Sequence, residues 1–251
     1  MKKEKIAISL DKSLLAMVDS TIDNVSVVSR SQAISVLLQS ALAKKYITQA
    51  VILLRADQLN LLFQDIKGKS FLEKQIEFLM NNGIETIYLV TGENPKLDLV
   101  RKTAKQYDIN LEIVVEKKQK GNVAALELLQ HTLRTNFVLL NGDTLNTFPL
   151  KKMIHFHLRN DKELTIGLTI SSSSKGYNTV ALEGDQIVDY KENTAGKSSV
   201  IDAGIYICKP TLFSFISNRA DVLEKDVWPK LCKEQQARGY FTYGEYVHLG
   251  E

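Results

Sequence analysis

A glycine and an aspartate, Gly142 and Asp143, stand one residue after a short apolar run at 137–140 that has the character of a buried strand. A carboxylate at such a position is well placed to hold a divalent cation and a phosphate, because Mg²⁺ takes one or two protein carboxylates together with substrate oxygens. The same spacing also suits an aspartate that caps a helix predicted over 150–158. Spacing alone leaves a metal-binding role and a capping role for Asp143 evenly matched.

The elements that would position Asp143 begin at Gln49, where short apolar runs start to alternate with amphipathic segments. Strands are predicted at 51–54, 86–90, 111–115 and 137–140, and helices at 71–82, 97–107 and 121–133. This alternation predicts an α/β fold with a doubly wound, mostly parallel, Rossmann-like sheet. In such sheets ligands bind beyond the carboxyl ends of the strands. The loop after Leu54 and the Gly142-Asp143 turn are therefore expected at the mouth of one site.

A different pattern precedes this region. Over residues 5–10 large aliphatic side chains alternate with small or basic ones, which predicts a strand with one apolar face. Helices are predicted over 12–23, capped by Asp11, and over 29–45, capped by Ser29. One strand and two helices in about 46 residues bury too little apolar surface to be stable alone. Antiparallel pairing with the same strand of a second copy would supply both a core and a strand partner.

Residues 6–11, Leu14, Leu15 and residues 28–34 together resemble the ribbon-helix-helix family of DNA-binding domains. The resemblance implies a homodimer whose two-stranded ribbon enters the major groove of double-stranded DNA. It places Lys5, Ala7 and Ser9, with Lys3 beside them, toward the bases. It places Ser29, Arg30 and Ser31 on phosphates, because a helix N-terminus favours anions.

The charge distribution bears on this resemblance. Residues 1–48 hold seven basic and four acidic side chains, which equals the net charge of +3 of the whole chain. A basic end facing a polyanion is typical of nucleic-acid binders, although +3 is a weak field. The alternative is an arm that only pairs two copies and has a solvated strand face.

Residues 49–251 resemble the sugar-phosphate nucleotidyltransferases, which join a nucleoside triphosphate to a sugar 1-phosphate and release pyrophosphate. The matching segments occur in the family's order at 49–54, 67–76, 82–84, 121–126, 140–143, 176, 188–192 and 202–207. The resemblance implies a nucleotide or nucleotide-sugar ligand, with Mg²⁺ at Asp143 if a nucleotide is bound. The implied ligand-binding residues are Gly121, Gly142, Asp143, Gly176, Glu192 and Asp202.

Three departures from the family pattern fall where catalysis would occur. The family's glycine-rich phosphate loop is replaced by residues 55–66, which contain no glycine, so side chains would block close backbone approach to a phosphate. Asn193 stands where the family has a lysine. His248 stands where the family has a second metal-binding aspartate, and an imidazole suits Mg²⁺ poorly.

Composition and the departures together shape the functional hypothesis. The hydrophobic fraction of 44% and charged fraction of 24% are those of an ordinary soluble protein, and no apolar run reaches the roughly 18 residues of a membrane span. Two cysteines provide no disulfide framework, so a cytoplasmic location is expected.

The main hypothesis is a transcription regulator with a DNA-binding and dimerisation domain at 1–46. In it, a degenerate domain at 49–251 senses a ligand or assembles the protein, with dimers able to pair into tetramers, and is not expected to be catalytic. The alternative is an active sugar-phosphate nucleotidyltransferase that uses its N-terminal arm to dimerise.

Overall fold

The computed structural model describes residues 6–25, 27–118, 120–171, 176–192, 199–217 and 219–249, with backbone alone for 39–46. The chain divides into two compact units, Met1–Ala43 and Lys44–Glu251, which are described separately below. None of the helices in the described ranges is long and apolar enough to cross a lipid bilayer.

The first unit contains the two predicted helices. Helix α1, Lys12–Asp19, begins where predicted, because the Asp11 carboxylate accepts a hydrogen bond of 2.8 Å from the Leu14 N–H. It ends earlier than the predicted residue 23. The Asp23 carboxylate accepts hydrogen bonds from the backbone N–H groups of Val25 and Val27, which folds this segment into a turn instead of a further helical turn. Helix α2, Arg30–Tyr46, confirms the second predicted helix.

The predicted N-terminal strand is not formed in the described residues 6–10. A strand needs a second backbone to accept and donate its hydrogen bonds, and the described part of this unit presents no other strand. Ile6 and Ile8 are 78% and 53% exposed, while Val18 and Ala33 are the buried hydrophobic residues of the unit's described side chains. Pairing with a second copy stays a prediction.

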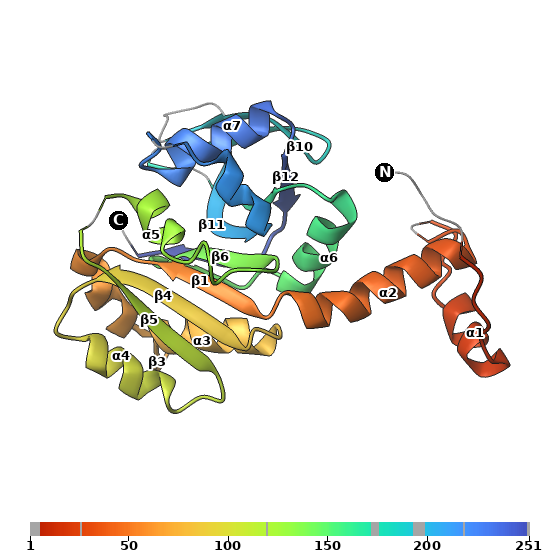
Figure 1. The fold of residues 1–251 in the computed structure, drawn as a ribbon, viewed down its shortest axis with the longest axis horizontal. Coiled ribbons are helices and arrows are strands. Elements are labelled where there is room, and N and C mark those ends of the chain that lie inside the picture. The colour runs from red at the N-terminus through yellow and green to blue at the C-terminus, as the bar shows by residue number, and fades with distance from the viewer. Residues whose placement is uncertain are drawn as a thin grey trace. The chain divides into compact units, whose positions relative to one another are not determined.

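The second unit is built on one nine-stranded sheet, whose strand order is β5-β4-β1-β6-β11-β8-β12-β10-β9 (Figure 1). The strands are β1 Gln49–Leu53, β4 Thr86–Gly92, β5 Asn110–Glu116, β6 Phe137–Asn141, β8 Leu164–Ile170, β9 Thr179–Glu183, β10 Gln186–Lys191, β11 Val200–Cys208 and β12 Ala237–Phe241. Two small pairs lie outside it, formed by β2 Asp65–Ile66 with β3 Lys69–Ser70 and by β7 Thr144–Asn146 with β13 Tyr246–His248.

The helices of this unit are α3 Phe71–Asn81, α4 Leu97–Ala104, α5 Asn122–Glu127, α6 Leu150–Asn160 and α7 Trp228–Lys233, with short helical turns η1 Ala56–Phe63, η2 Pro210–Phe215 and η3 Leu223–Val227. Helices α3 and α4 lie on one side of strands β4 and β5, and α5 lies on the other (Figure 1). Helix α3 starts at a capping box, in which Ser70 and Glu73 each accept from the other's backbone N–H. Gly83, with φ +92°, ends it as expected from its sequence position.

The sheet is mixed, which corrects the expectation of a mostly parallel one. Strands β5, β4, β1 and β6 run parallel to one another, as predicted from the alternation of strands and helices. Strand β11 runs antiparallel to both β6 and β8, and β9 and β10 form an antiparallel hairpin. Only Gly184 and Asp185 connect β9 to β10, and so short a connection can join only antiparallel strands.

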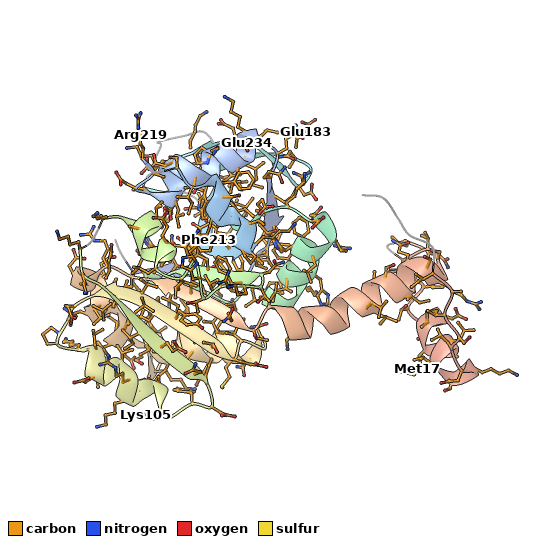
Figure 2. The ribbon with its side chains drawn as sticks, in the orientation of Figure 1. Met17, Lys105, Glu183, Phe213, Arg219 and Glu234 are labelled. Atoms are coloured by element: carbon orange, nitrogen blue, oxygen red, sulfur yellow. The ribbon has the colours of Figure 1, made fainter. Side chains whose placement is uncertain are left out.

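One hydrophobic core cluster lies between this sheet and the elements α5, η3 and α7. Trp228 of α7 is fully buried, and its ring centroid lies 5.2 Å from that of Tyr206 on β11. Phe213 of η2 stacks on Phe137 of β6, with centroids 6.4 Å apart. Figure 2 shows Phe213 within the unit, while labelled charged side chains such as Lys105 and Glu234 point outward.

Candidate functional site

The carboxyl ends of strands β1, β4, β5 and β6 border a cleft of about 490 Å³. The strand register explains why it forms there: Leu53 at the end of β1 lies opposite Val90 on β4 and Asn141 on β6, and all three line the cleft. The remaining lining residues are Leu54, Arg55, Gln58, Glu116, Gly121, Asn122, Ala125, Asp143, Val222 and Glu224. The cleft lies where ligands bind in parallel α/β sheets.

Gly121 forms part of the cleft wall at the start of α5. Its φ is +102°, and a Cβ atom added there would lie 2.1 Å from the backbone oxygen of Asp221. The Val123 N–H donates to the same oxygen over 3.3 Å. Glycine is therefore required twice at this position, for its backbone conformation and for the close approach of the segment before η3.

Gly142 brings the end of β6 against the end of β1. Its N–H donates to the Leu53 carbonyl over 2.7 Å, and a Cβ atom there would lie 2.6 Å from the Leu54 Cβ atom. This close packing directs the next residue, Asp143, into the cleft. The structure thus places Asp143 at the cleft and not at the N-terminus of α6, whose N-cap is Pro149.

His248 lies beside Asp143. Strand β13 pairs with β7 so that His248 is opposite Thr144, and the Leu249 N–H donates to the Asp143 carbonyl over 2.9 Å. The His248 Nε2 atom is 3.4 Å from the Asp143 Oδ2 atom, and the two side chains are 22% and 20% exposed. The position identified by resemblance as that of a second metal ligand therefore meets the first one in space.

Glu224 is a cleft residue that sequence reasoning missed. It lies in η3, is 7% exposed, and accepts hydrogen bonds from the Asn122 side chain at 2.7 Å and the Asn141 side chain at 3.3 Å. The Asn122 side-chain oxygen in turn accepts from the Leu223 N–H at 2.7 Å. Glu224 therefore ties the start of α5 to the end of β6. No local signal distinguishes it, because the segment 222–228 also contains the charged residues Lys225 and Asp226.

The segment that replaces a glycine-rich loop folds as η1. Leu59 and Leu62 are fully buried, so this segment is part of the core, while Gln58 lines the cleft. Arg55 also lines the cleft, and its guanidinium pairs with the Asp57 carboxylate, with the Nε atom 3.0 Å from Oδ1. Arg55 and Gln58 are thus the side chains of this segment that line the cleft.

The structure places the six residues expected to bind a ligand in different surroundings. Gly121 and Asp143 line the cleft, and Gly142 packs against Leu53 and Leu54, which line it. Gly176 precedes β9 with φ +88°, and Glu192 follows β10 and is exposed. Asp202 is buried in β11. These last three are not among the described residues that line the cleft, and Asn193 lies outside the described residues.

Asp202 accepts hydrogen bonds from two tyrosines. The Tyr190 and Tyr206 hydroxyl groups donate to its Oδ2 atom at 2.7 and 2.8 Å, and the Gly204 N–H donates to Oδ1 at 2.8 Å. Burial raises the pKa of Asp202 from 3.8 to about 7, and the hydrogen bonds from Tyr190 and Gly204 oppose the rise. The protonated form of this carboxyl is favoured by the fold.

We expect the Asp202→Asn substitution to flatten the dependence of stability on pH. The folded-state pKa of about 7 lies above the unfolded value of 3.8, so the folded chain binds this proton more tightly. The contribution of Asp202 to the free energy of unfolding is fully present below pH 3.8 and is lost as the pH rises to about 7. Between these values the free energy of unfolding falls by at most about 1.4 kcal/mol per pH unit. Urea unfolding of both proteins between pH 4 and 8 measures it. Parallel curves would contradict the assignment.

The residues expected to contact DNA are placed as follows. Ala7 and Ser9 are exposed in a segment without strand structure, and Lys3 and Lys5 lie outside the described residues. The Arg30 guanidinium, expected on a phosphate, forms two hydrogen bonds to the Asp19 carboxylate, at 2.6 and 2.8 Å. Ser29 accepts from the Gln32 N–H at 3.3 Å, and Ser31 is exposed. The first unit thus offers no preformed ribbon among its described residues.

Comparisons with known proteins bear on the second unit. A mannose-1-phosphate guanyltransferase of Aspergillus oryzae is 27% identical over 188 residues, which are 70% of this chain and 51% of that protein. The chain spans about half the length of the curated relatives it matches.

Solved structures show the same fold. HddC from Yersinia pseudotuberculosis covers 81% of this chain and 94% of its own, with 20% identity and a TM-score of 0.69. A UDP-glucose pyrophosphorylase complexed with UDP-glucose covers 82% of this chain and 94% of its own, with 17% identity and a TM-score of 0.67.

The sequence profile described as "Nucleotidyl transferase" matches residues 54–246. Together with the names of the relatives, this match contradicts the main sequence-based hypothesis of a DNA-binding regulator, and the expectation of a non-catalytic domain was also wrong. The departures at residues 55–66, 193 and 248 are local, whereas the matching segments occur in the family's order across residues 49–207, which is the stronger observation. With a cleft at the carboxyl ends of its parallel strands and a profile match over most of its length, the chain belongs to the nucleotidyl transferase family.

Proposed function

We propose that this chain transfers a nucleoside monophosphate from a nucleoside triphosphate to a sugar 1-phosphate. The observation that carries the proposal is the cleft that joins Asp143 to Gly121 at the ends of β6 and β5, in a chain of this family. A phosphate oxygen of the sugar 1-phosphate attacks the α-phosphorus. The bond from that phosphorus to the bridging oxygen breaks, and pyrophosphate leaves.

In this proposal the cleft holds the nucleotide at the sheet edge. Leu53, Val90 and Ala125 offer apolar surface, and Gln58, Asn122 and Glu116 offer polar groups. Close packing at Gly121 and Gly142 positions the walls, and Glu224 fixes them relative to each other through Asn122 and Asn141. Such pre-set geometry favours transfer because the reacting groups lose little further freedom.

Phosphoryl chemistry in this proposal needs charge at the cleft. Arg55 provides one positive group, and Asp143 provides a carboxylate that would hold a divalent cation. A bound cation supplies charge neutralisation at the phosphate oxygens. The proposed roles of this chain's residues are to hold that charge and to orient both phosphates, because little covalent chemistry is required of the protein.

A pyrophosphate-release assay tests the proposed function. The first substrates are GTP and mannose 1-phosphate, since the curated relatives carry the name mannose-1-phosphate guanyltransferase. ATP, CTP, UTP and dTTP, each with mannose or glucose 1-phosphate, complete the panel. We expect pyrophosphate release that depends on the sugar phosphate, with a nucleotide sugar identified by chromatography. Absence of product from every pair, with Mg²⁺ and with Mn²⁺, would reject the proposal.

A further inference from the structure

The pair Asp143 and His248 differs from the set of ligands that Mg²⁺ prefers. Mg²⁺ takes oxygen ligands in a near-ideal octahedron, whereas divalent ions of the first transition series also accept an imidazole nitrogen. His248 brings such a nitrogen to 3.4 Å from the Asp143 carboxylate. The described side chains at this point therefore do not fit a site built for Mg²⁺.

The separation of the two atoms fits a shared cation. Two ligand atoms bound to one ion at about 2.1 Å lie about 3.4 Å apart in a tetrahedral arrangement and about 3.0 Å apart when adjacent in an octahedral one. The His248 Nε2 and Asp143 Oδ2 atoms are 3.4 Å apart. One cation can bind both atoms without a change in the distance between them.

The backbone, and not only side-chain rotamers, brings the pair together. The hydrogen bond from the Leu249 N–H to the Asp143 carbonyl fixes β13 at the end of β6. The register of β13 with β7, in which His248 lies opposite Thr144, determines which side chain of β13 faces Asp143. A one-residue slip would turn His248 to the other face of the strand.

We propose that Asp143 and His248 jointly hold a divalent transition-metal ion, of the series from Mn²⁺ to Zn²⁺, in preference to Mg²⁺. No cluster of three or more His, Cys, Asp or Glu able to hold a metal occurs among the described residues. In this proposal water and phosphate oxygens fill the remaining positions around the ion, so phosphate strengthens its binding. The inference rests on the proposed function for the phosphate ligand but not for the two protein ligands.

Electron spin-echo spectroscopy of Mn²⁺ tests the proposal directly. Mn²⁺ is added to the full chain alone and with inorganic pyrophosphate, which contains no nitrogen. We expect modulation from one directly bound ¹⁴N nucleus in the unaltered protein, and its loss in His248→Asp and in His248→Gln. The matched control His131→Asp, at an exposed histidine, keeps the modulation.

Competition between Mn²⁺ and Mg²⁺ gives a second measurement. His248→Asp supplies a second carboxylate, so we expect the preference for Mn²⁺ over Mg²⁺ to fall at least about tenfold. The inference is overturned if the unaltered protein binds no Mn²⁺, or binds it without modulation from nitrogen. It is also overturned if both His248 variants keep that modulation. Nitrogen modulation without any nucleotidyl transfer would instead reject the proposed function and leave the metal site standing.

Discussion

Asp143→Asn is expected to lower the rate of nucleotidyl transfer by about 10²–10³-fold, the effect of losing one pre-positioned charged group from an active site. Asparagine has nearly the shape of aspartate, and the side chain is 20% exposed at the end of β6, so the fold should tolerate it. The amide has no negative charge and binds a divalent cation far less well than a carboxylate does. The sugar-dependent rate of pyrophosphate release at saturating substrate measures the effect.

Asp98→Asn is the matched control for this substitution. Asp98 is in the first turn of α4, pairs with Arg101 at the surface, and has a side chain that is 91% exposed. We expect this control to keep the rate of the unaltered protein, because exposed ion pairs contribute little. A rate for Asp143→Asn within tenfold of the unaltered protein, with both proteins folded, would show that Asp143 is not part of the reaction.

Gly121→Ala should destabilise the second unit by about 2–4 kcal/mol and reduce transfer strongly, since overpacking and an unfavourable backbone conformation act together. The added Cβ atom would lie 2.1 Å from the Asp221 backbone oxygen, and backbone cannot move aside as the end of a flexible side chain can. Asn122 and Glu224 would be displaced with it, because they are hydrogen-bonded to each other. Urea unfolding and the transfer assay measure the two effects.

Gly83→Ala separates the effect of conformation from the effect of crowding. Gly83 has a similar φ of +92°, and a Cβ atom there would meet nothing within 4 Å. The control should lose only about 1 kcal/mol, the penalty for a positive φ in a residue with a side chain. Equal destabilisation by the two substitutions would mean that the approach of Asp221 to Gly121 is unimportant.

The sequence was informative wherever structure depends on neighbours along the chain. Helix α3 could be predicted because Ser70 and Gly83 mark its two ends, and the parallel strands because aliphatic runs alternate with amphipathic segments. The Gly142-Asp143 turn was correctly expected at the ends of these strands.

Structural features formed by residues far apart in the sequence could not be predicted from local patterns. Glu224 reaches the cleft only because η3 packs against the start of α5, and its partners Asn122 and Asn141 are far from it in sequence. The antiparallel half of the sheet was missed because strand order is decided by connections and packing, not by local pattern. The ribbon-helix-helix resemblance rested on residues 6–11, Leu14, Leu15 and 28–34, and the strand among them can pair only with a partner that lies outside its own local sequence.

The location of β13 has a consequence for the order in which the protein acquires its site. Asp143 and His248 are separated by roughly 100 residues of chain, and contacts between such distant segments form slowly because a long loop must close first. A ribosome that synthesises this chain would release strands β1 to β6 long before β13 emerges. The nascent parallel half can therefore assemble early, while cation selectivity would be acquired last, when the final described strand docks beside β7.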